Sequence, residues 1–221
     1  MPHARSRMAV GLLALLLATP TLTAAQSADD SREKSEKVSE VLAALQAEPG
    51  KRVADLGAGE GFYTLRIARA VGATGRVTAV DISEKYLEKL RARLKQEDIT
   101  NVDLVVAGVD DPHLPTGTLD AVLIYNAYHE MTAHESILKA VLAALKPGGR
   151  LVMSEPVHDN IRDAARAAQV KEHEIGSNFV EQELQTTGFE VVEKRSDFVP
   201  FTAPGHKGGF WLIVARKPAQ R

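Results

Sequence analysis

A glycine-rich segment with an acid at its start is the part of the chain best suited to bind a cofactor. Asp55, Gly57, Gly59 and Gly61 follow the pattern D-x-G-x-G-x-G, between an expected strand and an expected helix. Glycines at such a junction let the backbone turn tightly and approach a ligand, and the helix N-terminus offers free N–H groups. A dinucleotide loop instead spaces its glycines as G-x-G-x-x-G. Because a carboxylate here repels a pyrophosphate and attracts an ammonium, the segment predicts a cofactor with a cationic group.

A second acid, Asp81, closes the next expected strand. It lies about 20 residues after Gly61, which is the distance at which nucleotide-binding folds place the acid that holds a ribose. One carboxylate accepts hydrogen bonds from two neighbouring hydroxyls. Asp81 therefore predicts a nucleoside in the cofactor, with a helix N-cap as the alternative role.

The segment after the fourth expected strand offers groups for a second substrate. It reads Tyr125-Asn126-Ala127-Tyr128-His129-Glu130. In doubly wound folds, ligands bind outside the carboxyl ends of the strands. His129 is the first catalytic candidate, as a base or as a group that orients the substrate, because imidazole titrates near neutral pH. Tyr128 is the second, with a role in shaping the pocket. The alternative for His129 is packing or hydrogen bonding within the loop.

Three adjacent His–acid pairs raise the question of a metal site. They are His129-Glu130, His158-Asp159 and His173-Glu174. None belongs to an i, i+4 His repeat or to a compact cluster of ligands in the sequence. The sequence therefore predicts no metal site.

Short apolar runs alternate with amphipathic segments along most of the chain. The expected strands are Arg52–Leu56, Arg76–Val80, Val102–Ala107, Ala121–Tyr125 and Leu151–Ser154, with helices between them. Strands this uniformly apolar are buried on both faces, as in a parallel sheet. Farther on, Glu190–Val199 and Phe210–Ala215 read as two strands with no helix between them, so they pair antiparallel. The expected fold is α/β: a doubly wound, mostly parallel seven-stranded sheet that ends in a C-terminal antiparallel hairpin.

These motifs together resemble the class I S-adenosylmethionine-dependent methyltransferases, which have a Rossmann-like fold. The resemblance extends over nearly the whole chain after residue 25. It rests on the glycine segment and on four later motifs at strand ends: Ala79-Val80-Asp81-Ile82-Ser83, Gly108-Val109-Asp110-Asp111-Pro112, Leu119-Asp120-Ala121-Val122 and Leu145-Lys146-Pro147-Gly148-Gly149-Arg150-Leu151.

The resemblance implies S-adenosylmethionine as cofactor and a small molecule as methyl acceptor. Asp55 and the glycine backbone would hold the methionine part, Asp81 the ribose and Asp110 the adenine amino group. Many relatives have Gly-Asp directly where Val109 intervenes here, so Asp111 is the alternative to Asp110. The expected cofactor contacts are Asp55, Gly57, Ala58, Gly59, Gly61, Asp81, Ile82, Asp110 and Asn126.

The first residues have the features of a secretory signal. Arg5 and Arg7 precede an uncharged apolar run, and Thr23-Ala24-Ala25 offers small residues for cleavage. The apolar run is shorter than the ~20 residues of a spanning helix, so no stable membrane anchor is expected. The expected organisation is a signal peptide over residues 1–25, a flexible linker over 26–37 and a methyltransferase domain over 38–221, in a periplasmic or secreted protein.

Composition excludes several other classes of protein. The chain has 221 residues, a formal charge of −2 and no cysteine, so disulfides, thiolate nucleophiles and Cys-ligated metals are excluded. Basic and aromatic residues do not interleave, which disfavours nucleic acid as a partner. Two alternatives remain: a non-catalytic protein that binds the cofactor, and an NAD-dependent oxidoreductase, which Asp55 and the glycine spacing oppose. The sequence leaves the acceptor, the methylated atom and the oligomeric state open.

Overall fold

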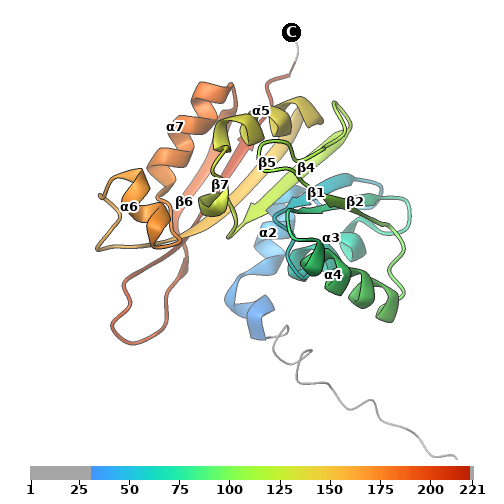
Figure 1. Ribbon diagram of the computed structural model, residues 1–221, viewed down its shortest axis with the longest axis horizontal. Coiled ribbons are helices and arrows are strands. Elements are labelled where there is room, and N and C mark those ends of the chain that lie inside the picture. The colour runs from blue at the N-terminus through green and yellow to red at the C-terminus, as the bar shows by residue number, and fades with distance from the viewer. Residues whose placement is uncertain (1–30, 220–221) are drawn as a thin grey trace, which may run out of the picture.

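The computed structural model describes residues 31–219 (Figure 1). The predicted signal peptide lies outside these residues, and so does the first part of the predicted linker. Residues 31–35 of that linker are helical. Glu33 accepts a hydrogen bond from Arg66, and the Arg32 guanidinium lies 3.8 Å from the centre of the Phe62 ring. The end of the predicted linker is therefore packed against the domain instead of free.

A seven-stranded sheet forms the centre of the fold. Its order is β3-β2-β1-β4-β5-β7-β6, and only β7 runs antiparallel to its neighbours β5 and β6. The predicted doubly wound, mostly parallel sheet with a C-terminal antiparallel hairpin is thus confirmed. The strands are β1 (Arg52–Leu56), β2 (Arg76–Asp81), β3 (Val102–Val106), β4 (Leu119–Tyr125), β5 (Leu145–His158), β6 (Glu190–Pro200) and β7 (Gly208–Arg216).

Helices cover both faces of this sheet (Figure 1). Apolar side chains of α2 and α3 pack on one face, and those of α5 and α7 pack on the other. Helix α4 forms a smaller cluster with β2 and α3 through Leu87, Leu90 and Leu94. The helical elements are α2 (Val38–Leu45), α3 (Phe62–Val71), α4 (Glu84–Gln96), the 3₁₀ turn η1 (Tyr128–Glu130), α5 (His134–Ala144), α6 (Arg166–Lys171) and α7 (Ser177–Thr187).

The fifth strand is longer than its apolar core suggests. The sequence predicts Leu151–Ser154, whereas β5 spans Leu145–His158. Its start pairs with β4, and β7 pairs with it from Arg150 to His158. Partner strands on both sides therefore extend β5 beyond its valine-rich stretch. The extension carries Glu155 and His158 to the same end of the sheet as the glycine segment.

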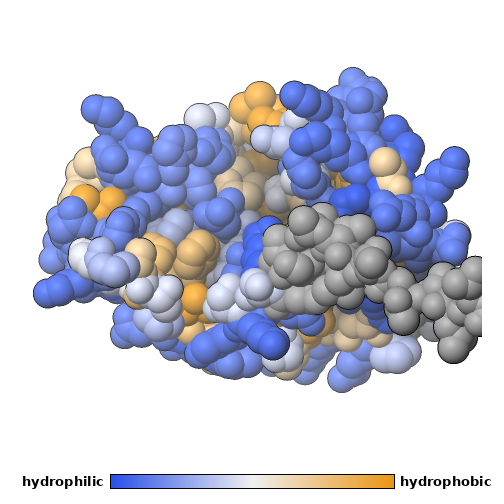
Figure 2. All heavy atoms as spheres, turned by 90° about the horizontal axis from the view of Figure 1, so that it is seen from below, coloured by the Kyte–Doolittle hydropathy of each residue, from blue (hydrophilic) through white to orange (hydrophobic). Residues whose placement is uncertain are grey.

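Within residues 31–219, no helix combines the length and apolarity needed to cross a membrane. Figure 2 shows a face that is largely hydrophilic, with smaller groups of hydrophobic atoms between the charged side chains.

Candidate functional site

A cavity of about 430 Å³ opens at the carboxyl ends of the parallel strands. We call it the cofactor cavity. Its walls come from the segments that follow β1, β2, β3 and β4, as expected where the order of strands reverses in a doubly wound sheet. The lining residues are Leu56, Gly57, Gly59, Asp81, Ile82, Ser83, Tyr86, Ala107, Gly108, Val109, Asn126, Ala127, Glu130, Met131, Thr132 and Ile137.

The glycine segment forms one wall of the cavity, and two of its positions have no room for a larger residue. Gly57 has φ +83°, and a Cβ on it would lie 2.4 Å from Cβ of Ala127. Gly61 has φ +87° and stands at the N-cap of α3, where a Cβ would lie 2.1 Å from a methyl of Leu90. Both positions combine a left-handed backbone with close contact. Ala58 and Gly61 lie behind the cavity wall, so they shape the segment instead of lining the cavity.

Asp81 is held rigidly beside the glycine segment. Its Oδ2 accepts a hydrogen bond from the Gly59 N–H at 2.8 Å, and its Oδ1 accepts one from the Ser83 N–H at 2.8 Å. Each carboxylate oxygen has a further lone pair. The carboxylate is therefore fixed toward the cavity and can accept hydrogen bonds from two ligand hydroxyls.

Apolar side chains beside Asp81 stay exposed at the cavity. Ile82 is 68% exposed, Val109 64% and Tyr86 44%. All three line the cavity, together with Met131. Large hydrophobic side chains left exposed around one hollow are typical of a binding site for an apolar or aromatic group.

Asp55 lies beneath this wall, and its surroundings change its acidity. It is only 3% exposed and accepts a hydrogen bond from the Thr64 hydroxyl at 2.6 Å. Burial raises the pKa of Asp55 to about 6, although the bond from Thr64 acts in the opposite direction. A nearby cation would restore the charged form. Asp55 is thus poised to respond to a cationic ligand, but it does not line the cavity itself.

We expect Asp55→Asn to stabilise the protein at neutral pH. A folded-state pKa of about 6, above the ordinary value of 3.8 for aspartate, means that stability is highest at low pH and is lost as the pH rises through about 6. Asparagine removes this cost, so the advantage of the variant in the free energy of unfolding should grow by about 1–2 kcal/mol between pH 5 and pH 8. Urea unfolding at both pH values measures it. Asp103→Asn is the control, since Arg76 lowers the pKa of that exposed carboxyl. An advantage that stays constant with pH would contradict the raised pKa.

The predicted adenine contact stays a prediction, because neither acid proposed for it lines the cavity. Asp110 is exposed and does not line the cavity, whereas its neighbours Gly108 and Val109 do. The alternative, Asp111, is also exposed and accepts a hydrogen bond from the His113 N–H at 2.8 Å. Val109, which stands between Gly108 and Asp110, lines the cavity with an exposed apolar side chain.

Of the segment after β4, Asn126 faces the cavity whereas Tyr128 is buried in the core. Asn126 lines the cavity in a left-handed conformation with φ +53°, and its N–H donates to the Ser154 carbonyl. Tyr128 is fully buried in the core, and its hydroxyl donates to Glu183 Oε2 at 2.8 Å. Because its ring and hydroxyl are both engaged in the core, this position favours a structural role, and the catalytic role of Tyr128 stays a prediction.

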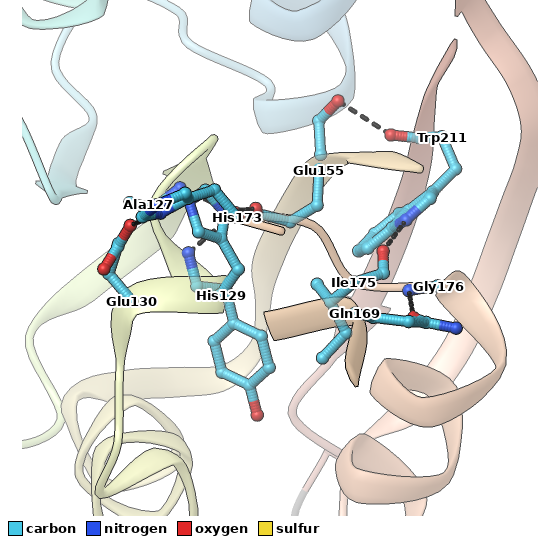
Figure 3. Close-up of polar contacts among 11 residues, drawn as sticks. Ala127, His129, Glu130, Glu155, Gln169, His173, Ile175, Gly176 and Trp211 are labelled. Atoms are coloured by element: carbon cyan, nitrogen blue, oxygen red, sulfur yellow. Dashed lines mark hydrogen bonds and ion pairs between the residues drawn. The ribbon is translucent and has the colours of Figure 1, made fainter. Parts of the chain in front are cut away.

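His129 is held by a buried carboxylate (Figure 3). Its Nδ1 donates to Glu155 Oε2 at 2.5 Å. The other oxygen of Glu155 accepts from the N–H groups of Ala127 and Tyr128, each at 2.7 Å. Burial alone would lower the pKa of His129, but the bond to Glu155 and the charges of Glu155 and Glu130 raise it above its ordinary value. The ring is therefore fixed in orientation, with Nε2 directed away from Glu155 toward Glu130.

His173 reaches the same place from a distant part of the chain (Figure 3). Nε2 of His129 is 3.3 Å from Glu130 Oε1, and Nδ1 of His173 is 2.5 Å from that same oxygen. The two imidazole rings meet edge to face with centroids 6.0 Å apart. The sequence does not reveal this group, because only tertiary packing brings His173 to His129 and Glu130.

A larger cavity of about 920 Å³ lies apart from the glycine segment. His158, Glu174 and His206 are among its lining residues, and His158 hydrogen-bonds to both of the others. It includes none of the cofactor-cavity residues. Five of the predicted cofactor contacts line the smaller cavity instead: Gly57, Gly59, Asp81, Ile82 and Asn126.

Glu155 belongs to the segment that follows the fifth expected strand, a candidate region for the acceptor site, but the sequence alone assigns it no role. It is fully buried in the run Leu151–Val157 of β5, which is apolar apart from Ser154 and Glu155 itself. An acid in such a run is the signal that could have marked it, since buried carboxylates need partners. Its partner was hidden because β4 and β5 come together only through sheet pairing, with Tyr125 opposite Ser154.

Comparison with known proteins agrees with this geometry. Residues 53–149 match the family model described as a methyltransferase domain. A ubiquinone/menaquinone biosynthesis C-methyltransferase of Shewanella halifaxensis is 34% identical over 120 residues, which are 52% of this chain and 48% of that protein. The corresponding enzyme of Vibrio vulnificus is 36% identical over 117 residues, covering 51% and 45%. The chain thus spans about half the length of the curated relatives it matches.

Solved structures share the fold at low sequence identity. An S-adenosylmethionine-dependent methyltransferase from Aquifex aeolicus has a TM-score of 0.70 at 20% identity, covering 86% of this chain and 95% of its own. The [4+2]-cyclase SpnF has a TM-score of 0.73 at 19% identity, covering 86% and 83%. The cyclase shows that this fold also supports other chemistry. The chain thus has a Rossmann-like fold, and its residues 53–149 are similar to a methyltransferase domain.

Proposed function

We propose that the protein is an S-adenosylmethionine-dependent methyltransferase that acts on a small molecule. The observation that carries the proposal is the cofactor cavity within the matched domain. There Asp81 is fixed for two hydroxyls, while Ile82 and Val109 offer apolar surface for a base. These are the demands of an adenosine group: hydrogen-bond acceptors for the ribose and flat apolar contacts for the adenine.

The methionine part of the cofactor fits the glycine wall. Its ammonium is a cation, and Asp55 lies below the wall as a carboxyl that a cation would return to its charged form. A pyrophosphate would have the opposite effect, since its negative charge would oppose ionisation of Asp55. This contrast favours S-adenosylmethionine over a nicotinamide dinucleotide.

The acceptor lies on the side of His129. Methyl transfer from a sulfonium is an in-line displacement with an activated leaving group, so positioning the acceptor supplies most of the catalysis. Asn126 and Glu130 line the cavity at the end of β4, and His129 adjoins them with its ring fixed by Glu155. We assign His129 to holding the acceptor next to the methyl group.

The size of the cavity supports a small acceptor. At about 430 Å³, it lies in the range of sites for cofactors and small molecules. The C-methyltransferase names of the curated relatives belong to proteins of which this chain covers about half, so the methylated atom is not carried over from them.

Cofactor binding is expected to separate this function from the oxidoreductase alternative. S-adenosylhomocysteine, added at 100 times its Kd, should stabilise the protein by about 2.7 kcal/mol, whereas NAD should produce no shift in Tm. Thermal-shift titration of the tag-free protein with both ligands measures this. Gly57→Val is the matched control, because its side chain would fill the wall beside Ala127 and should remove the response. Stabilisation by NAD alone would refute the proposal. Binding without turnover of any acceptor would favour a non-catalytic binding protein.

A further inference from the structure

His129, Glu130 and His173 form a group beside the cofactor cavity that methyl transfer alone does not explain (Figure 3). One potential ligand atom from each lies within 4.8 Å of the other two. Two imidazoles and one carboxylate form a donor set that suits divalent first-row transition metals. We propose that these three residues bind such an ion, for example Zn²⁺ or Mn²⁺. This departs from the expectation, based on the sequence alone, that there is no metal site.

The distances within the group are close to those of a metal site. With metal–ligand bonds of about 2.0–2.1 Å, neighbouring ligand atoms in a tetrahedral site lie about 3.3 Å apart. Nε2 of His129 and Oε1 of Glu130 are already 3.3 Å apart. Nδ1 of His173 is 2.5 Å from that oxygen. An ion would replace this hydrogen bond and move the two atoms about 0.8 Å farther apart, to about 3.3 Å. Both side chains are largely exposed and can make this adjustment.

Glu155 supplies the outer support that metal-binding histidines require. A ligating imidazole nearly always donates its second ring nitrogen to a carboxylate or carbonyl, which fixes the tautomer and the orientation of the ring. His129 donates Nδ1 to Glu155 Oε2, so the lone pair is on Nε2, the atom next to Glu130. Two backbone N–H groups hold the other oxygen of Glu155. An ordinary histidine–acid pair on the surface would form without a buried carboxylate that fixes the histidine ring.

The fold also fixes the segment that carries His173. Gln169 is fully buried, donates to three carbonyls of residues 161–164 and accepts from the Gly176 N–H at 2.6 Å. Trp211 donates its indole N–H to the Ile175 carbonyl at 2.7 Å. The turn before Ile175 is thus anchored at both ends, which places His173 opposite η1. A mobile surface histidine would not be held in this way.

The position of the group gives the ion a role, which rests on the methyltransferase function proposed above. Glu130 lines the cofactor cavity next to Met131. Three protein ligands leave coordination positions free, as catalytic metal sites do. The ion would bind an oxygen of the acceptor, so the proposed acceptor class is a small molecule with a hydroxyl or carboxylate next to the atom that is methylated.

Metal binding is tested with the ion alone. Titration calorimetry of the tag-free, chelator-treated protein with Zn²⁺ and Mn²⁺ should show one saturable site, and Co²⁺ should give the visible absorption of a nitrogen- and oxygen-ligated ion. His173→Ala and Glu130→Gln should each weaken binding at least ~10-fold, the loss that follows even when outer-shell partners are removed. Both side chains are exposed, so these variants should keep the wild-type Tm.

His113→Ala is the matched control, because it changes another exposed His–acid pair, with Asp111, away from the group. It should leave metal affinity unchanged. Absence of a saturable site, or equal affinity in wild type and His173→Ala, would overturn the metal proposal. Titration with S-adenosylhomocysteine is run in parallel: if the cofactor binds and the metal does not, only this inference fails, and if the cofactor does not bind, the proposed function fails.

Discussion

Replacing His129 by asparagine is expected to lower kcat by about 10²–10⁴-fold while changing the affinity for S-adenosylhomocysteine by less than about twofold. The range is that of a lost general acid or base, whereas loss of a group that only orients the acceptor should raise KM and change kcat less. The cofactor affinity is preserved because the cofactor contacts come from other strand ends, around Asp81 and Gly59. Release of S-adenosylhomocysteine, measured with hydroxylated aromatic and hydroxy-acid acceptors, gives kcat. Calorimetry gives the affinity.

The design has to separate catalysis from folding, because His129 is bonded to a buried carboxylate. Removing it leaves the Oε2 atom of Glu155 without its partner, which should cost about 1–3 kcal/mol of stability. Activity is therefore compared at a temperature well below the Tm of the variant. His134→Asn is the control, since that ring packs against Tyr128 outside the cofactor cavity. Unchanged kcat in His129→Asn, or loss of cofactor binding with the fold intact, would contradict the acceptor-side role.

Comparing the kcat of wild type with that of His173→Ala and Glu130→Gln shows whether His129 acts alone or as a metal ligand. If His129 acts alone, His173→Ala should retain most of the kcat. If His129 acts as a metal ligand, His173→Ala should lose kcat in step with metal affinity. The same set of proteins thus distinguishes a lone histidine from a metal-binding group.

The fold was predictable from the sequence because its signals are local. Valine-rich runs such as Arg76–Val80, with amphipathic helices between them, determine a parallel sheet buried on both faces. The absence of a helix between residues 200 and 208 predicts the antiparallel hairpin. Strand ends were less predictable: β5 is extended at both ends by pairing with β4 and β7, which no single segment reveals.

The cofactor cavity was predictable in part for the same reason. Gly57, Gly59, Asp81, Ile82 and Asn126 line it, because each stands at a strand end that the sequence marks. The group around His129 was not predictable, because it depends on residues far apart in the chain. Glu155 meets His129 through strand pairing, and His173 meets Glu130 through the buried Gln169. Tyr128, next to His129 in sequence, is directed into the core by the 3₁₀ turn.

Asp81→Ala is expected to weaken binding of S-adenosylhomocysteine by about 1.5–3 kcal/mol for each charge-assisted hydrogen bond lost, which is about 10- to 150-fold per bond. Asp81→Asn should have a smaller effect, because it keeps one acceptor oxygen. Glu88→Ala is the matched control: it removes a carboxylate from exposed α4, outside the cavity lining. Calorimetry measures all three. Equal affinity in wild type and Asp81→Ala would mean that the ribose binds elsewhere.

Asp81 also holds the Gly59 and Ser83 N–H groups, so a loss of affinity could arise from a rearranged loop instead of lost ribose contacts. A ligand that lacks the 2′-hydroxyl separates the two causes. Wild type should bind 2′-deoxy-S-adenosylhomocysteine at least ~10-fold more weakly than the parent compound, since one charge-assisted hydrogen bond is missing. Asp81→Ala should bind both ligands about equally, because the partner of that hydroxyl is already gone. A double-mutant cycle over protein and ligand then yields a coupling energy of about 1.5 kcal/mol or more if the carboxylate meets the hydroxyl, and about zero if Asp81 acts only on the loop.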